Sequence, residues 1–156
     1  MRILVLSDSH NKNSLLEKAL ECQPKAKTVF FLGDGADSMQ DISKFFPDRK
    51  FYIVAGNCDF SSKFPKTEFA DINGIKIMAT HGDIYRVKSG LDTLCCAAER
   101  ENAKIVLYGH THNADILYKN ETYYINPGAV CGSGGKSTYA VIDITEAGIL
   151  PGIITL

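Results

Sequence analysis

The stretch Arg2–His10, which reads RILVLSDSH, sets the pattern from which the fold is predicted. Arg2–Ser7 is a short apolar run bounded by polar residues, which is typical of a buried β-strand and is too short for a helix. Asp8 and His10 follow directly after this run. The chain therefore opens with a strand that ends in side chains able to bind a metal ion.

The same arrangement recurs four more times along the chain. Gly33-Asp34 follows Val29–Leu32, Gly56-Asn57-Cys58-Asp59 follows Tyr52–Ala55, His81-Gly82-Asp83 follows Ile75–Thr80, and Gly109-His110-Thr111-His112 follows Ile105–Tyr108. All 4 histidines of the chain lie in these motifs. Because ligands bind beyond the carboxyl ends of strands in open α/β sheets, we expect the five strand ends to converge on one site.

The first half of the sequence alternates strands with helices. Strands are predicted at Thr28–Leu32 and Phe51–Ala55. A capping box formed by Ser14 and Glu17 predicts a helix that runs to about Cys22, and a second helix is predicted from near Ser38 to before Pro47. This alternation predicts a parallel sheet with right-handed crossovers.

The second half has a different pattern. Asn73-Gly74 lies between two strand-like runs and predicts a hairpin, because both turn residues accept a positive φ. Apolar residues at helical spacing predict a helix over Ser89–Glu101. The other predicted strands are Thr67–Ile72, Ile75–Thr80, Lys104–Tyr108, Ala114–Lys119, Thr122–Asn126, Thr138–Ile144 and Gly148–Thr155. We expect this half to be mostly antiparallel, and the two halves to form two packed sheets with helices outside.

Length and composition exclude several classes of protein. A chain of 156 residues predicts a single domain over 1–156. Lys and Arg total 17 and Asp and Glu total 18, so the net charge of −1 argues against a protein that coats nucleic acid or binds a membrane surface through a basic face. No signal peptide or membrane span is expected. The five cysteines form an odd set that predicts reduced thiols and a cytoplasmic location.

The side chains at the strand ends have a specific metal chemistry. Three oxygen donors and four imidazoles are available, at Asp8, Asp34, Asn57, His10, His81, His110 and His112. Seven donors exceed what one tetrahedral zinc ion uses, whereas two ions that share a carboxylate use them all. A mixture of nitrogen and oxygen donors favours manganese, iron, zinc, nickel or cobalt.

In order and spacing, these motifs resemble those of the calcineurin-like metallophosphoesterases across residues 8–112. The small size and the segment Tyr124-Ile125-Asn126-Pro127-Gly128 resemble the single-domain phosphodiesterase branch of that family. The resemblance implies an α/β fold, a four-layer αββα sandwich of two packed mixed sheets flanked by helices.

The resemblance also implies a role for each strand-end residue. Asp8, His10 and His112 would hold one ion, Asn57, His81 and His110 would hold a second, and Asp34 would bridge both. The implied activity is hydrolysis of a small soluble phosphodiester by in-line attack of a metal-bridging hydroxide, with Asp34, Asn57, His81 and His110 as catalytic residues. Manganese is the first expected metal, with nickel, zinc, iron and cobalt as alternatives. The expected partner is a small phosphoester, without a nucleic acid or a membrane, and a homodimer is compatible with the apolar edges of the second half.

Cys58 departs from the pattern of the family. Many members have a histidine directly after the motif asparagine, where it is proposed to protonate the leaving group. A thiol with a pKa near 8.5 suits that role less well at neutral pH. We therefore expect the best activity on esters with good leaving groups. Asp59 and Asp83 are candidates for orienting the histidines that bind metal, or for simple turn residues.

The sequence also resembles a non-catalytic scaffold and, in one segment, a phosphate-binding loop. The fold also resembles the phosphoesterase-like subunit of the retromer coat, so a weakly active or inactive scaffold for protein binding is the alternative function. The complete set of seven donors favours the enzyme. Gly135-Lys136-Ser137 resembles the end of a phosphate-binding loop, but Val130 replaces the first glycine that this loop requires.

Overall fold

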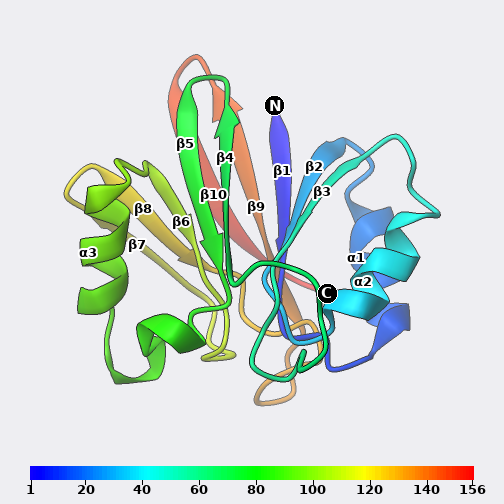
Figure 1. The fold of residues 1–156 in the computed structure, drawn as a ribbon. Coiled ribbons are helices and arrows are strands. Elements are labelled where there is room, and N and C mark those ends of the chain that lie inside the picture. The colour runs from blue at the N-terminus through cyan, green and yellow to red at the C-terminus, as the bar shows by residue number, and fades with distance from the viewer.

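The computed structural model describes residues 1–156, and its centre is a pair of five-stranded sheets packed face to face (Figure 1). The first sheet has the order β10-β9-β1-β2-β3, and its strands are β1 (Arg2–Leu6), β2 (Ala26–Phe31), β3 (Lys50–Ile53), β9 (Thr138–Thr145) and β10 (Gly148–Thr155). The second has the order β4-β5-β6-β8-β7, and its strands are β4 (Thr67–Ile72), β5 (Ile75–Thr80), β6 (Ile105–Leu107), β7 (Asp115–Lys119) and β8 (Thr122–Asn126).

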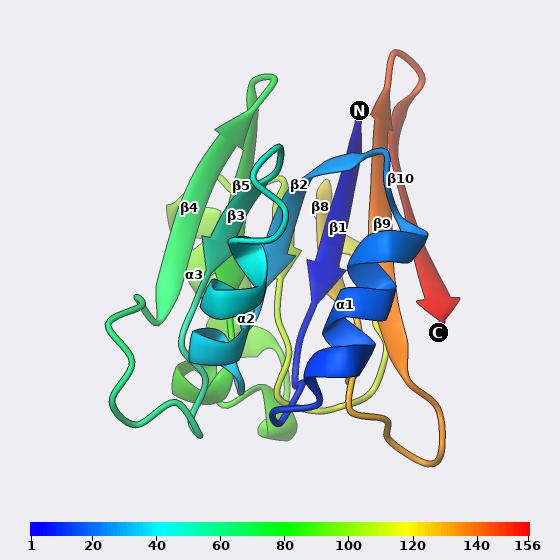
Figure 2. The same cartoon turned by 90° about the vertical axis from the view of Figure 1, so that its right-hand side faces the viewer.

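Helices cover the outer face of each sheet. Both α1 (Asn13–Cys22) and α2 (Ala36–Ser43) lie on the first sheet, as Figure 2 shows, and α3 (Asp92–Arg100) lies on the second. Two short 3₁₀ turns, η1 (Asp83–Tyr85) and η2 (Val87–Ser89), precede α3. No helix is long and apolar enough to cross a bilayer.

The alternation of side chains in the strands produces three apolar layers. In β1, Ile3 and Val5 pack between the two sheets, whereas Leu4 and Leu6 pack beneath α1 and α2. A third cluster lies between the second sheet and α3 and includes Leu94. The predicted four-layer αββα architecture is confirmed.

The strand pairs of the second half are mostly antiparallel, as predicted, but they include a parallel centre and do not all lie in one sheet. Strands β5, β6 and β8 are parallel, with β4 and β7 antiparallel at the edges. Strands β9 and β10 return to the first sheet, where β9 pairs antiparallel with β1. The reason is burial: Tyr139 and Val141 face the helical layer while Ala140 and Ile142 face the other sheet, so β9 is covered on both sides.

Helix beginnings also differ from the prediction. Helix α1 begins at Asn13 after Lys12 and has no side-chain cap, so the capping box of Ser14 is not formed. The chain reaches this helix through His10 and Asn11, both with positive φ, and turns directly into it. Helix α3 begins at Asp92 and not at Ser89, because Gly90 has a φ of 136° and interrupts the helix.

Candidate metal centre

All seven predicted donors gather at one end of the two sheets, at the carboxyl ends of the strands in Figure 1. Asp8, Asp34 and Asn57 follow strands β1, β2 and β3 of the first sheet. His81 follows β5, and His110 follows β6, in the second sheet. The site therefore lies across the junction of the two sheets, as the convergence of strand ends predicted.

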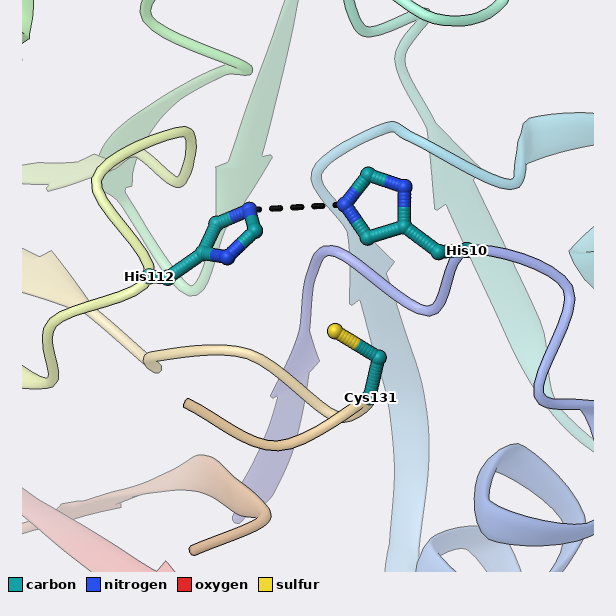
Figure 3. Close-up of side chains that lie close together, drawn as sticks. All are labelled: His10, His112 and Cys131. Atoms are coloured by element: carbon teal, nitrogen blue, oxygen red, sulfur yellow. Dashed lines mark hydrogen bonds between the residues drawn. The ribbon is translucent and has the colours of Figure 1, made fainter. Parts of the chain in front are cut away.

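One group of donors surrounds His112. Its Nε2 lies 3.0 Å from Oδ1 of Asp8 and 3.4 Å from Nε2 of His10 (Figure 3). The same His10 nitrogen lies 3.8 Å from Oδ2 of Asp34. Four donor residues thus lie within reach of one point.

A second group surrounds His81. Its Nε2 lies 3.0 Å from Oδ1 of Asn57, 3.1 Å from Nδ1 of His110 and 3.6 Å from Oδ2 of Asp34. Oδ2 of Asp34 is therefore the atom common to both groups. The arrangement places a single carboxylate between two sets of three side chains.

Asp8 has a buried oxygen without a hydrogen-bond donor. The side chain is fully buried, and its Oδ2 accepts from Oγ of Ser7 at 2.6 Å and from the backbone N–H of His110 at 3.2 Å. Oδ1 has no hydrogen bond, although it lies close to His112. A buried acceptor without a donor costs about 1–3 kcal/mol, a cost that a bound cation removes. The residues present therefore fit a metal ion.

His81 is held with an unprotonated nitrogen facing the other donors. Its Nδ1 lies 2.7 Å from the carbonyl oxygen of Leu32, which only accepts, so we place the ring proton on Nδ1. Asn57 donates through Nδ2 to Sγ of Cys58 at 3.3 Å, which turns its Oδ1 toward Nε2 of His81. The lone pair on Nε2 of His81 thus faces two acceptor oxygens, Oδ1 of Asn57 and Oδ2 of Asp34, with no proton between them. A divalent cation satisfies such an arrangement.

The ionisation of the neighbouring groups suits metal binding by the imidazoles. Burial, together with His81 and the charge of Lys88, lowers the pKa of His110 and favours the neutral ring that metals bind. Burial raises the pKa of the Cys58 thiol, and the carboxylates of Asp34 and Asp59 raise it further. Cys58 is therefore a protonated thiol at neutral pH.

Most of the seven donors have a strained backbone. The φ angles are 53° at Asp8, 44° at His10, 57° at Asp34, 68° at His110 and 60° at His112. The left-handed region costs a residue other than glycine about 1–2 kcal/mol. Such strain persists only where the surrounding structure enforces it, and it is concentrated at functional sites.

The glycines before two of the donors allow the chains to approach closely. A Cβ on Gly56 would lie 2.1 Å from Oδ1 of Asp34, and a Cβ on Gly109 would lie 2.1 Å from Oγ of Ser7 and 2.9 Å from Oδ2 of Asp8. These distances are far inside van der Waals contact. The small residue at each of these strand ends is therefore required for packing of the carboxylates.

Asp59 and Asp83 do not orient the histidines. Asp59 accepts four backbone N–H groups, from Asp34, Gly35, Ala36 and Gly56, at 2.8–3.1 Å. Asp83 lies 3.7 Å from Nζ of Lys66. Asp59 therefore joins the loop after β3 to the loop before α2, and the two carboxylates shape the loops around the site.

Cys131 is a residue at the centre that sequence reasoning missed. Its Sγ and one ring nitrogen from each of His10 and His112 all lie within 4.8 Å of one another, and Figure 3 shows the thiol pointing toward the two rings. The loop after β8 carries it, and no local motif in that loop indicates a ligand. The only signal in the sequence was the residue type.

The largest cavity adjoins the loop 109–112. It has a volume of about 630 Å³ and is lined by Val87, Lys88, Leu91, Tyr108, Thr111, Asn113, Ala114 and Asp115. These residues come from η2 and the residue before α3, from the segment after β6 and from the first residue of β7. The cavity contains one lysine and several polar side chains, and Thr111 of its lining lies between His110 and His112 in the sequence.

Residues 1–147 match the model of the calcineurin-like phosphoesterase superfamily domain. The chain is 28% identical over 167 residues to phosphodiesterase MJ0936 of Methanocaldococcus jannaschii, covering 92% of this chain and 93% of the relative. A predicted phosphoesterase from Streptococcus pneumoniae superposes with a TM-score of 0.84 and 26% identity, over 99% of this chain and 88% of the other.

A third similarity concerns the fold alone. A single mutant of Vps29 from Entamoeba histolytica superposes with a TM-score of 0.78 over 100% of this chain and 99% of the other, at 18% identity. The same architecture thus occurs both in a predicted phosphoesterase and in Vps29.

Proposed function

Because the chain belongs to the calcineurin-like phosphoesterase superfamily, we propose that it is a phosphodiesterase that uses two divalent ions to hydrolyse a small soluble phosphodiester. The observation that supports this most is the pair of donor groups that share Oδ2 of Asp34. A protein that bound a single structural ion would not need both groups.

In this proposal the two ions have separate ligands and one common one. Asp8, His10 and His112 would hold the first, Asn57, His81 and His110 would hold the second, and Asp34 would be the ligand common to both. When bound, such ions would make water a better nucleophile toward phosphorus and would stabilise the charge that develops on the phosphoryl oxygens. Manganese is the first metal to test, followed by nickel, zinc, iron and cobalt.

The protein side chains limit the negative charge at the centre and orient the donors. Asn57 is neutral, so the two carboxylates of Asp8 and Asp34 are the only anionic donors among the seven. The protein has Cys58, and no imidazole, at the position from which a proton would be donated to the leaving group. The raised pKa of this thiol makes it a weak acid. We therefore propose that the preferred substrates carry leaving groups that need little protonation.

The cavity beside the loop 109–112 is proposed to hold part of the substrate. Its volume of about 630 Å³ is in the range of small-molecule pockets. Lys88 offers a positive charge there, and Asn113 offers an amide that donates and accepts. Asp115 adds a carboxylate to the same lining, so Lys88 is the group there that would pair with an anionic phosphodiester.

Turnover of bis(p-nitrophenyl) phosphate by metal-stripped protein tests the proposal. We expect no release of nitrophenol without metal and recovery of activity when manganese is added. The other four divalent ions are tested in parallel. Failure of every ion to restore turnover, in protein that remains folded, would contradict a metal-dependent phosphodiesterase.

Substitution of single donors tests the role of the centre. Asp34→Ala and His110→Ala are each expected to lower kcat by more than about 100-fold, because each removes a ligand from the centre that stabilises the transition state. Asp41→Ala removes an exposed carboxylate of α2 and serves as the matched control. Turnover near that of the control in either variant would contradict the proposed centre.

The alternative function is a scaffold with weak or no catalytic activity. The likeness to Vps29 shows that the fold alone does not determine activity. A panel of phosphomonoesters and phosphodiesters separates the two functions. A protein that binds two ions and hydrolyses none of the panel supports the scaffold.

The proposal includes a cytoplasmic location and allows a homodimer. The odd set of cysteines supports the reducing cytoplasm, since none of the five is paired. A monomer and a homodimer are distinguished by light scattering on the purified protein.

A further inference from the structure

We propose that Cys131 is an additional ligand of the first metal position, which it provides with a sulfur donor that the second position lacks. This inference rests on the dinuclear centre of the proposed function. It concerns a residue outside the seven donors assigned there. The argument depends on the placement of Cys131, on the distances between donor atoms and on the buried oxygen of Asp8.

The backbone of Cys131 is fixed to the loop that carries Asp8 and His10. Its N–H donates to the carbonyl oxygen of Asp8 at 3.0 Å, and the N–H of Val130 donates to that of Ser7 at 3.0 Å. Nζ of Lys12 donates to the carbonyl oxygen of Cys131 at 2.7 Å. These three hydrogen bonds hold the thiol beside the first donor group.

The distances between donor atoms match those around one ion. Metal–nitrogen bonds of about 2.0–2.1 Å at a tetrahedral angle place two nitrogens about 3.4 Å apart. Nε2 of His10 and Nε2 of His112 lie 3.4 Å apart. With a metal–sulfur bond of about 2.3 Å, a sulfur lies about 3.6 Å from each nitrogen. Sγ of Cys131 lies within 4.8 Å of a ring nitrogen of each histidine.

The thiol has no strong hydrogen bond that a metal ion would have to break. Its only polar contact is a weak one of 3.7 Å to the carbonyl oxygen of Gly132. The side chain is half-buried, so it is neither locked in the core nor fully solvated. When sulfur binds the ion, the thiol proton is released to solvent, because a thiolate is the form that binds metals.

The buried oxygen of Asp8 marks the same position independently. Oδ1 of Asp8 is fully buried, lacks a hydrogen-bond donor and lies 3.0 Å from Nε2 of His112. The first position thus has two imidazoles, a buried carboxylate oxygen beside His112, and a thiol within 4.8 Å of both imidazoles. This donor set is softer than the nitrogen and oxygen donors around His81.

The difference in donors predicts different metals at the two positions. Thiolate ligands favour zinc and similar soft ions over manganese, whereas carboxylate, amide and imidazole donors accept manganese. The first position is therefore expected to hold zinc or cobalt in preference to manganese. The second position keeps the manganese expected from the sequence.

Cys58 is the matched control for this inference. Its Sγ also lies within 4.8 Å of a ring nitrogen of His10, together with a carboxylate oxygen of Asp34. However, that sulfur accepts a hydrogen bond from the amide of Asn57 at 3.3 Å. The side chain is exposed and belongs to a different loop. Cys22, exposed on α1, provides a second control that is remote from the centre.

The test is the absorption spectrum of metal-stripped protein titrated with cobalt(II). We expect visible d–d bands and a near-ultraviolet sulfur-to-cobalt charge-transfer band in the wild type. Cys131→Ser should lose the charge-transfer band and keep the d–d bands. Cys58→Ser and Cys22→Ser should keep both. Competition of zinc against manganese provides a second measurement, in which Cys131→Ser and Cys131→Ala should each lower the preference for zinc about 10-fold or more.

The outcomes separate this inference from the proposed function. Cobalt d–d bands without a charge-transfer band in the wild type would overturn the role of Cys131 and leave the dinuclear centre intact. A band that survives in Cys131→Ser and disappears in Cys58→Ser would overturn it as well. Absence of all cobalt bands in folded protein would contradict the centre itself. Unchanged zinc preference in both Cys131 variants would also count against the thiolate ligand.

Discussion

The left-handed backbone at five of the seven donors means that their side chains are retained against a conformational cost. His112 is the clearest example, because its side chain is partly exposed and its φ is 60°. The imidazole occupies a position where the backbone itself favours glycine. Strain of this kind has a measurable consequence for stability.

In metal-free protein, His112→Gly is expected to be more stable than His112→Ala by about 1 kcal/mol, because glycine adopts this φ without strain. Urea unfolding of the two variants measures the difference. The control pair is Cys96→Gly and Cys96→Ala within α3, where the order should reverse because glycine destabilises a helix by about 1 kcal/mol. Equal stability of the two His112 variants would contradict a conformational cost of the positive φ at this position.

In the proposed enzyme, Cys58 is expected to limit which leaving groups are tolerated. Replacing it by histidine, Cys58→His, is expected to raise turnover of an alkyl phosphodiester at least 10-fold relative to an activated one, because an imidazole with a pKa near 6.5 is a better acid at neutral pH. Cys58→Ser is the control that leaves the site without an imidazole. The ratio of the two rates is the readout, and an unchanged ratio in Cys58→His would remove this position from leaving-group protonation.

At the scale of elements, Asp59 connects the loop after β3 to the beginning of α2. Asp59→Ala leaves four backbone N–H groups without their acceptor, so we expect a loss of about 2–4 kcal/mol in the free energy of unfolding. Denaturant unfolding measures it. Asp48→Ala, at an exposed carboxylate paired with Lys27, is expected to change stability by less than about 1 kcal/mol. A similar effect in both variants would contradict the role of Asp59.

The same carboxylate predicts a pH dependence. Burial raises the pKa of Asp59, but the backbone N–H groups of Gly56, Gly35, Ala36 and Asp34 outweigh it, and the pKa lies below its usual value. A carboxyl whose pKa is lowered on folding stabilises the protein above its unfolded pKa of about 3.9, and this stabilisation is lost as the pH falls through the folded value. The stability difference between wild type and Asp59→Ala should therefore shrink below about pH 4. A difference that stays constant from pH 7 to pH 3 would contradict this.

Much of the element structure was predictable, and the exceptions have physical reasons. Apolar runs such as Arg2–Ser7 identified the strands, and the rule on strand ends predicted that Asp34 and His110 lie together although they belong to different sheets. The sequence did not predict that β9 joins the first sheet, because a short alternating pattern does not indicate with which strand it pairs. Cys131 was missed since its loop is positioned by backbone hydrogen bonds to Ser7 and Asp8, which leave no trace in the residue types.

At the scale of the whole molecule, the proposed centre connects the two sheets. Asp8 and Asn57 follow strands of the first sheet, and His81 and His110 follow strands of the second. Ions bound between them would hold the layers together and stabilise the folded state. The fold and the proposed metal content are thus linked.

Metal binding is expected to raise the midpoint of thermal unfolding. An ion at 100 times its Kd stabilises the folded state by about 2.7 kcal/mol, which corresponds to about 5–10 °C for a chain of this size. Differential scanning calorimetry of stripped and manganese-loaded protein measures the shift. Asp34→Ala, which lacks the common ligand, should show less than half of it. A wild-type midpoint that does not respond to metal would contradict the connection between the sheets.

The hairpin tips at Asn73-Gly74 and Glu146-Ala147 lie at the opposite end of the sheets from the donor loops (Figure 1). Neither tip contributes a side chain to the donor loops, so both are natural attachment points for a foreign peptide. An epitope or fluorophore placed there would let the protein be immobilised on a surface in one defined orientation, with the proposed metal centre facing the solution.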